Sequence, residues 1–471
     1  MRDNIPWCYY DKNAPDYCKD SSFNWSASDI GFTDAFYDKM YNNFIANLNV
    51  DDVGAVVASR DNTTPGGSYF YNWMRDGALC IKTYQDLNNS NFNAVQATLR
   101  KYVSWVRNNQ GKTDKNNDVR IEPKFEIPSG EPYTGGWCRP QTDGPGLRAN
   151  SLSMWTQTLL NNDGSSTTEA ESVWELVKHD LDWVTNNWTS SGCDLWEEVR
   201  SDDFFWGRSA FVFALKRAAS VADAFVQRGV DVSTNSALKS AYLSKASEIG
   251  NVILNDHYKN SYIYESTGRQ QDGAVIHAIA TFGEHLWKPN STEAAATISK
   301  LNKTFCNEYP LNQADNKAGE PGILIGRYPG DSYAGGNPWQ LLTAALAETF
   351  YLASKAFLNT ENSSSTFLKG NNQENVKAWM KLLNISENDD KLTLRDLANS
   401  SKDAGDAVMS RLWKYVKNDD GRIDEQIDKS TGAQKSAKGL TWSYANLLHA
   451  IKTRKDLVAQ LSGAKMVAMD A

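Results

Sequence analysis

Apolar residues recur at intervals of three and four along much of the chain, which is the spacing of one face of an α-helix. Three stripes show this best: Phe32, Phe36, Met40, Phe44 and Leu48; Val95, Leu99, Tyr102, Val103 and Val106; Val173, Leu176, Val177, Leu181 and Val184. Further helices are predicted around 207–227, 236–256, 293–304, 338–357, 403–417 and 436–452. Alternating strand patterns are rare and short, so the pattern predicts an all-α fold.

Loops rich in Gly, Pro, Trp, Arg and Asp separate these helices. They are centred near residues 70, 137, 197, 329 and 425–442, one or two helix hairpins apart. A toroid of helix hairpins would bring one such loop per hairpin to a common end. No sequence-identical repeat is visible, so this prediction depends on loop spacing alone. We expect a helical toroid with a pocket formed by loops at one end.

The composition favours one large domain spanning residues 1–471. No long Pro-, Gly- or Ser/Thr-rich tract is present to link two independent cores. A net charge of −8 and the lack of a Lys/Arg cluster argue against nucleic acid as a partner. The best apolar segment, 339–358, is interrupted by Gln340, Glu348 and Lys355, so we expect a soluble protein without a membrane span.

Cysteines and glycosylation sequons bear on the compartment. Six cysteines show neither CxxC spacing nor a Cys/His zinc pattern. Cys8 and Cys18 are close enough to be bridged, but six cysteines allow about 15 full pairings and the sequence does not choose among them. The Asn-x-Ser/Thr sequons favour secretion, with the vacuolar lumen as the alternative, although the N-terminus lacks the apolar core of a signal peptide. These sequons are Asn24, Asn62, Asn88, Asn187, Asn290, Asn302, Asn362, Asn384 and Asn399.

Two adjacent carboxylates follow a large apolar ring in the segment 194–199, Asp-Leu-Trp-Glu-Glu-Val. A carboxyl group held against an indole loses hydration, which disfavours its charged form and lets it act as a general acid. Glu197 is the candidate donor, and we expect Trp196 and the neighbouring carboxylates to keep its proton in place. The triplet alone is weak, because Glu pairs are common on solvated helix faces. Glycoside hydrolysis needs a second carboxylate, for which Glu425 is the candidate.

Four further segments combine aromatic residues with charged or amide groups. They are 59–76, 133–145, 326–339 and 424–445. This mixture recognises sugars, since apolar ring faces stack on Trp and Tyr while hydroxyls pair with Arg and Asp. The 16 Trp residues exceed what packing ordinarily requires. Together these loops indicate a carbohydrate-binding pocket.

With these motifs, from Tyr69 to Tyr444, the chain resembles the fungal and yeast glucoamylases, the glucan 1,4-α-glucosidases of glycoside hydrolase family 15. The resemblance implies an (α/α)6 barrel with Glu197 as general acid and Glu425 as general base. The chain departs from the family at Cys138, which stands where the family has the Gly of a Gly-Arg-Pro-Gln tetrad. No Ser/Thr-rich linker or separate starch-binding domain is present, so we expect a single catalytic domain.

The resemblance also implies a set of substrate-binding residues. Arg75 and Asp76 match the pair that holds the hydroxyls of the terminal glucose, and Arg327 matches a further sugar-binding arginine. Tyr133 and Trp137 match the loop that covers the pocket. The remaining contacts are Tyr69, which would orient the catalytic water, Trp196 and Glu198, which flank the acid, Trp442 in the pocket wall, and Trp73, Leu195, Asp331, Tyr333 and Trp339.

What the resemblance implies for activity is an exo-acting, inverting hydrolase that releases β-D-glucose from starch, glycogen and malto-oligosaccharides, more slowly at α-1,6 links. Two carboxyls about 6.5–9.5 Å apart would leave room for the attacking water. The alternatives are another toroidal glycosidase, acting on trehalose or a β-glucan, and a non-catalytic glycan-binding protein. HExxH, GxSxG and P-loop motifs are absent, so we expect neither cofactor nor metal. We also expect the protein to be a monomer.

Overall fold

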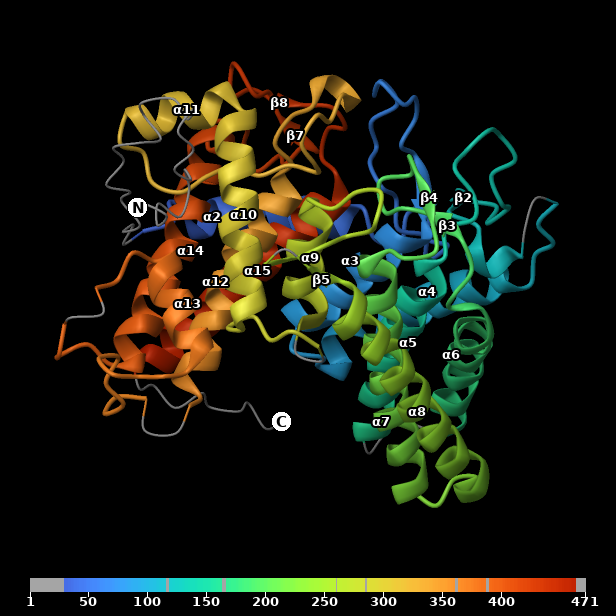
Figure 1. Cartoon of the computed structure of the whole chain (residues 1–471). Coiled ribbons are helices and arrows are strands. Elements are labelled where there is room, and N and C mark those ends of the chain that lie inside the picture. The colour runs from blue at the N-terminus through green and yellow to red at the C-terminus, as the bar shows by residue number, and fades with distance from the viewer. Residues whose placement is uncertain are drawn as a thin grey trace.

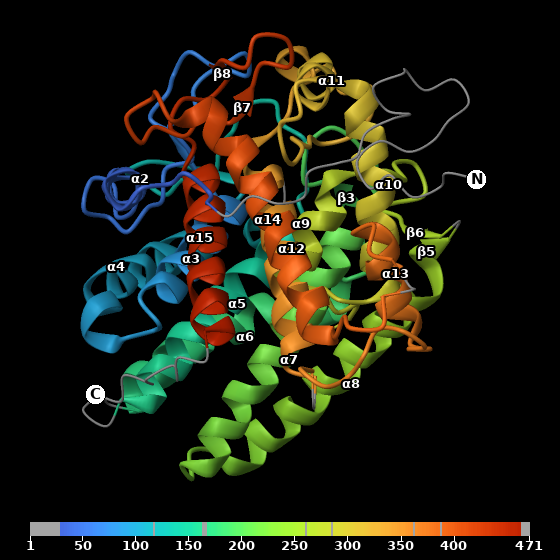
Figure 2. The ribbon, with the colours of Figure 1, turned by 90° about the vertical axis from the view of Figure 1, so that its left-hand side faces the viewer.

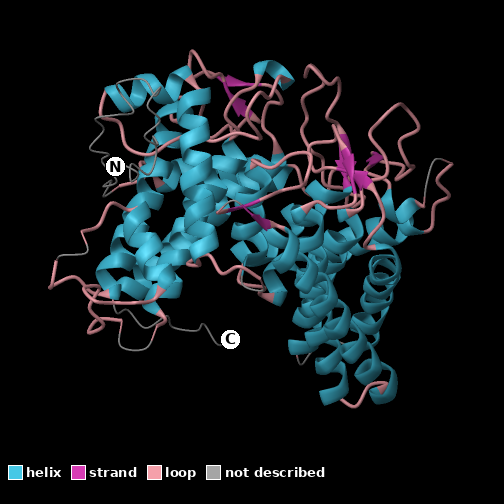
Figure 3. Cartoon of the chain, in the orientation of Figure 1, coloured by secondary structure: helices cyan, strands magenta, loops and turns pink. Residues whose placement is uncertain are grey.

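The computed structural model describes residues 29–462 except 116–117, 163–166, 260, 284–285, 361–362 and 387–388. Cys8, Cys18 and the sequons at Asn24 and Asn362 lie outside the described residues. Helices dominate the fold, and β-structure is limited to short strand pairs (Figure 3). The all-α prediction is therefore confirmed.

Six helices form a closed inner ring. Each packs against the next in chain order, and the sixth packs against the first. They are α3 (Met74–Leu87), α5 (Asp143–Asn161), α7 (Phe205–Gln227), α9 (Gly273–Phe282), α12 (Gln340–Leu358) and α15 (Thr441–Leu461). These helices are buried on most sides, and in α12 even Gln340 and Glu348 have little solvent exposure.

Six further helices cover the outside of this ring. They are α2 (Asp34–Ala46) on α15, α4 (Phe92–Gln110) on α3 and α5, α6 (Thr167–Asn187) on α5, α8 (Val232–Asp256) on α7, α10 (Thr292–Glu308) on α9 and α14 (Leu394–Val416) on α12. Outer and inner helices alternate along the chain, which makes the fold an (α/α)6 barrel (Figures 1 and 2). Two short helices, α11 (Pro310–Lys317) and α13 (Glu374–Leu382), pack on α10.

The outer helices bury the predicted apolar stripes. In α6, Val173 and Val177 are buried while Glu171 and Glu175 are exposed. An outer helix contacts the ring on one face and water on the other, so its sequence must be amphipathic. The stripe that starts at Phe32 is longer than its helix. Helix α2 ends at Ala46, and Leu48, the last residue of the stripe, is buried just beyond it.

Two predicted helix starts are wrong. The helix predicted over 436–452 begins at Thr441, because Ser436 and Gly439 have positive φ angles of 66° and 61° that no α-helix accommodates. The helix predicted over 403–417 begins earlier, at Leu394. Thr393 and Asp396 form a capping box there, which satisfies the free N–H groups of the first turn.

Four antiparallel strand pairs accompany the barrel. They are β1 (Tyr71–Trp73) with β2 (Lys124–Glu126), β3 (Gly192–Cys193) with β4 (Arg200–Ser201), β5 (Tyr258–Lys259) with β6 (Tyr262–Ile263) and β7 (Gln426–Ile427) with β8 (Gln434–Lys435). The first pair starts just before α3, the second lies before α7 and the fourth before α15. These pairs brace the loops at the end of the barrel where the inner helices begin.

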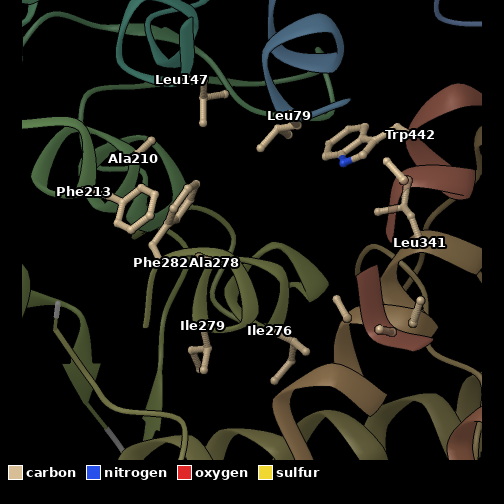
Figure 4. Packing of buried hydrophobic residues seen from close by; sticks show 14 of the residues in the cluster. Leu79, Leu147, Ala210, Phe213, Ile276, Ala278, Ile279, Phe282, Leu341 and Trp442 are labelled. Atoms are coloured by element: carbon tan, nitrogen blue, oxygen red, sulfur yellow. The ribbon is translucent and has the colours of Figure 1, made fainter. Parts of the chain in front are cut away.

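Hydrophobic side chains fill the interior of the inner ring. Figure 4 labels Leu79 of α3, Leu147 of α5, Ala210 and Phe213 of α7, Ile276, Ala278, Ile279 and Phe282 of α9, Leu341 of α12 and Trp442 of α15. Burial of this apolar surface stabilises the barrel and holds the inner helices at fixed distances from one another. The ring is therefore a packed core and not a channel.

The apolar character of α12 follows from its place in the ring. Among the described residues it is the one helix long and apolar enough to cross a membrane, and 78% of its most apolar window is buried inside the fold. Its contacts with α9, α14 and α15 account for that burial. A buried core helix and a membrane span have similar compositions, so the sequence of α12 needs no membrane to explain it.

Cysteines and sequons take positions that the sequence did not indicate. Cys138 and Cys193 form a disulfide with Cα atoms 6.0 Å apart, and Cys80 is a buried free thiol. Asn62 and Asn384 are exposed, whereas Asn302 is fully buried in α10. A glycan cannot be accommodated on a fully buried side chain, so Asn302 is not available for glycosylation in the folded protein.

Candidate active site

A cavity of about 260 Å³ lies among the loops that precede five of the six inner helices. Its lining comprises Ala58, Gly66, Tyr69, Trp73, Arg75, Asp76, Trp137, Cys138, Leu195, Trp196, Glu197, Glu198, Arg327, Tyr333, Trp339, Glu425, Leu440 and Trp442. The structure thus brings together all the predicted site residues except Tyr133 and Asp331. Among the described residues, no group of His, Cys, Asp and Glu side chains is arranged to hold a metal ion.

Glu197 lies at the tip of the turn between β3 and β4, with a φ angle of 66°. Its Oε1 accepts hydrogen bonds from the indole N–H of Trp73 at 2.8 Å and the side-chain amide of Gln141 at 2.9 Å. Its Oε2 accepts one from the indole N–H of Trp137 at 2.9 Å. The guanidinium of Arg75 is 3.8 Å away. Three hydrogen-bond donors and the nearby guanidinium, from the two segments 73–75 and 137–141, therefore fix the orientation of this carboxyl group.

The indole N–H of Trp196, the residue before Glu197, has a partner other than the carboxyl of Glu197. Its indole N–H donates to the carboxylate of Asp272, the N-cap of α9, at 2.9 Å. Consecutive residues in a tight turn point in different directions, so adjacency in sequence did not predict contact here. The indoles next to Glu197 are instead those of Trp73 and Trp137.

Glu198 connects two arginines at the edge of the cavity. It accepts from Arg327 at 2.8 Å and from Arg269 at 3.1 Å, and the hydroxyl of Tyr328 also donates to it. Arg327 in turn forms a bidentate pair with Asp331, at 2.9 and 2.5 Å. Asp331 itself does not line the cavity. It contributes to the site by holding Arg327 in place.

Arg75 is buried and held by two side chains at the start of α5, Gln141 just before the helix and Asp143 at its first position. It donates to Asp143 at 2.6 and 3.2 Å and to Gln141 at 2.7 Å. A bidentate pair of this kind leaves the guanidinium little freedom, so its remaining edge points towards Glu197 at a fixed position. Asp76 follows it on α3 and borders the same cavity. Burial raises the pKa of Asp76 to about 7, which the charge of Arg75 opposes.

Glu425 is the most enclosed carboxyl group of the cavity, with 2% exposure. Tyr69 donates to its Oε1 at 3.2 Å, and Gln426 donates to its Oε2 at 3.0 Å. The Tyr69 hydroxyl also shares a hydrogen bond of 2.7 Å with that of Tyr333. Burial raises the pKa of Glu425 to about 7, while Arg327 and the hydrogen bonds favour its ionised form.

Sequence reasoning missed several residues that position the site. Gln141 stands in the quoted segment 133–145, but its contact with Glu197 appears only when the loops meet. The contacts of Asp143 with Arg75 and of Asp272 with Trp196 also appear only in the folded structure. The residues next to Lys124 in the sequence do not indicate a role in the site, since it is the β1–β2 pairing that brings it opposite Trp73. The missing information in each case is a long-range contact.

The buried carboxyls predict how stability depends on pH. Burial raises the pKa of each of these groups to about 7: Asp76, Glu122, Asp272 and Glu425; it also raises that of Glu265. An unfolded chain releases these protons near pH 4, so between pH 4 and 7 the folded state holds more protons and loses stability as pH rises. His257 and His277, whose pKa values burial lowers to about 4, act in the opposite direction but are fewer.

We expect the thermal midpoint to be several degrees higher at pH 5 than at pH 7, measured by circular dichroism at constant ionic strength. Asp272→Asn removes one of these titrations and should reduce the difference. A midpoint that is equal at both pH values, or higher at pH 7, would contradict the prediction.

The comparisons with known proteins agree with this geometry. The sequence profile described as Glycosyl hydrolases family 15 matches residues 36–452. The chain is 31% identical to Glucoamylase-1 of Schizophyllum commune over 433 residues, which cover 87% of this chain and 70% of the relative. It is 30% identical to Glucoamylase GLA1 of Saccharomycopsis fibuligera over 453 residues, or 86% and 85% of the two chains. The solved glucoamylase of Saccharomycopsis fibuligera superimposes with a TM-score of 0.75 at 25% identity, covering 93% of this chain and 99% of that one.

An (α/α)6 barrel with carboxyl, arginine and aromatic side chains around a cavity at one end is the architecture of the helical-barrel glycoside hydrolases. The family profile spans both rings of helices and every loop that lines the cavity. The chain belongs to glycosyl hydrolases family 15.

Proposed function

We propose that this protein is a glucoamylase-type enzyme that removes β-D-glucose from the non-reducing ends of α-1,4-glucans, with slower action on α-1,6 links. Family membership, the glucoamylase relatives and the fold support a glucan 1,4-α-glucosidase. The observation that carries the mechanism is that Glu197 and Glu425 come from different loops and border one cavity. The packed barrel interior below supports exo action, because a glucan can enter with its end but cannot thread through.

Glu197 acts as the general acid in this proposal. In its protonated form it donates a proton to the glycosidic oxygen as the bond from that oxygen to the anomeric carbon breaks. Ionised Glu425 takes a proton from a water that Tyr69 helps to orient, and the resulting hydroxyl adds to the anomeric carbon. The acid ends ionised and the base protonated, and exchange with solvent restores both. Asp76 and Glu198 lie where their charge stabilises the positive sugar ring of the transition state.

The cavity wall suggests how glucose is recognised. Arg75 and Arg327 are each fixed by a bidentate carboxylate and can present their remaining N–H groups to sugar hydroxyls. Trp73, Trp137 and Trp339 supply apolar faces for the sugar ring. Starch, glycogen and malto-oligosaccharides are the proposed substrates. We propose that the protein is secreted or lies in the vacuolar lumen, because the Cys138–Cys193 disulfide and the exposed sequons are typical of an oxidising compartment. We also propose that it is a monomer.

The stereochemistry of the first product tests this proposal. Proton NMR of glucose formed early from maltotriose should show the β-anomer before mutarotation, because water attacks from the side opposite the leaving group. Trehalose and cellobiose, run in parallel, should give turnover at least about 100-fold lower, since an α-1,4 site loses hydrogen bonds to either linkage. Release of the α-anomer would overturn the inverting mechanism, and preferred cleavage of trehalose or cellobiose would overturn the substrate class.

A further inference from the structure

The side chain of Lys124 is enclosed by four aromatic rings. Its ammonium nitrogen lies 4.4 Å from the ring centre of Tyr71, 4.6 Å from that of Trp73, 3.9 Å from that of Tyr133 and 3.6 Å from that of Trp137. All four distances are within the range of cation–π attraction. Lys124 has 2% exposure and is not part of the cavity lining. Its charge is thus directed at the rings and not at a bound sugar.

The four rings also contact one another in a closed circuit, which we call the aromatic cage. Successive ring centres are 5.9 Å apart for Tyr71 and Trp73, 5.8 Å for Trp73 and Trp137, 6.3 Å for Trp137 and Tyr133, and 5.2 Å for Tyr133 and Tyr71. Backbone pairing places Lys124 inside the cage. It lies opposite Trp73 in the β1–β2 pair, and its backbone carbonyl accepts a hydrogen bond from the N–H of Tyr133 at 3.0 Å. The cage therefore consists of four mutually packed rings with one cation at its centre.

Two members of the cage hold the proposed general acid. Trp73 donates to one oxygen of Glu197 and Trp137 to the other. A cation over an indole ring holds the ring in place and makes its N–H a stronger donor. We propose that Lys124 is a positioning residue that orients both indoles and, through them and its own charge, favours the ionised form of Glu197. Glu197 becomes ionised when it donates its proton to the glycosidic oxygen, so Lys124 would lower the barrier to this proton transfer. This inference rests on the proposed role of Glu197.

Other charges around these groups stay in place when Lys124 is changed. Glu197 faces Arg75, Asp76 and Tyr69. Lys124 faces Glu197, Arg139, Glu126 and Glu122. Burial lowers the pKa of Lys124 to about 8, and the charge of Glu197 is the strongest influence against this lowering. The interaction between the two charges stabilises both of them, so removal of the Lys124 charge disfavours the ionised form of Glu197.

The test compares Lys124→Met, which keeps length and apolar volume without the charge, with Lys124→Arg, which keeps the charge. The pH dependence of kcat/KM for maltotriose is measured in the full chain. For the Met variant, the basic limb should move to higher pH by about one unit, with a lower kcat at the optimum and little change in KM. The Arg variant should keep the wild-type limb. An unmoved limb in a folded Met variant would overturn the proposal, because a merely structural role changes activity without shifting the profile.

A second measurement needs neither turnover nor a folded Met variant. In the wild-type chain labelled with 15N-tryptophan, the indole resonances of Trp73 and Trp137 should titrate near pH 8 as Lys124 loses its proton. Lys124→Arg should remove this step, and Trp→Phe variants assign the two signals. Absence of the step in the wild type would overturn the inference. The outcome is independent of whether Glu197 is the acid, which Glu197→Gln decides separately.

Discussion

Replacing Glu197 with Gln is expected to lower kcat for maltotriose by about 10²–10⁴-fold or more, while KM changes only a few-fold. Gln has nearly the same shape but carries no acidic proton for the leaving oxygen. The variant also disturbs a set of donors, because Trp73, Gln141 and Trp137 all point at the carboxyl and one amide oxygen cannot accept from both sides. Substrate binding should persist, since Arg75, Arg327 and the aromatic wall are unchanged.

The leaving group distinguishes loss of the acid from general damage. α-Glucosyl fluoride needs little or no protonation to leave, so Glu197→Gln should hydrolyse it within about tenfold of the wild-type rate. Glu171→Gln, an exposed carboxyl on α6, serves as the matched control and should behave as wild type. Near-normal turnover of maltotriose by Glu197→Gln would discard the proposed role of this residue.

Replacing Glu425 with Gln should lower kcat by several orders of magnitude on both maltotriose and α-glucosyl fluoride. Water must lose a proton as it attacks in either reaction, and Tyr69 alone cannot take it. The side chain has 2% exposure and accepts the hydrogen bond of Tyr69, and Glu197 is already engaged by Trp73, Gln141 and Trp137, so we expect no neighbour to replace it.

Glu425→Ala adds a chemical rescue to this second prediction. Removal of the side chain leaves room for a small anion, and azide needs no deprotonation before it attacks. Azide should therefore accelerate the reaction of α-glucosyl fluoride and give β-glucosyl azide. Turnover close to wild type in Glu425→Gln, or an α-azide product in Glu425→Ala, would contradict the role of Glu425 as the base for attack from the β face.

The sequence predicted the outer ring of helices better than the inner ring. Outer helices such as α6 have one face in water, and their apolar stripes can be read directly. The inner helices α3, α5 and α9 were not predicted from periodicity; in α5 and α9 the reason is that most residues are buried and leave no polar face. The prediction of a toroid was nevertheless correct. It depended on the distances in sequence between the functional loops, which match the length of a helix hairpin even where the individual helices were not recognised.

For the candidate site, the sequence predicted which loops meet but not which side chains touch. Each of the five loops that we predicted to form the site contributes residues to the cavity lining. The contacts of Glu197 come from Trp73 and Trp137, whereas its sequence neighbour Trp196 binds Asp272. The pairing of Cys138 with Cys193 was one among many possible pairings. Each of these contacts joins distant segments, and a single sequence contains no direct record of them.

Closure of the ring through α3 and α15 has a consequence for synthesis of the protein. While a nascent chain lacks α15, the surfaces of α3 and α12 that it covers remain without their partner. Such an intermediate exposes apolar residues that chaperones bind, and it also lacks Trp442, a residue of α15 that lines the cavity. Hydrolytic activity should therefore appear only after α15 has been translated and has closed the ring.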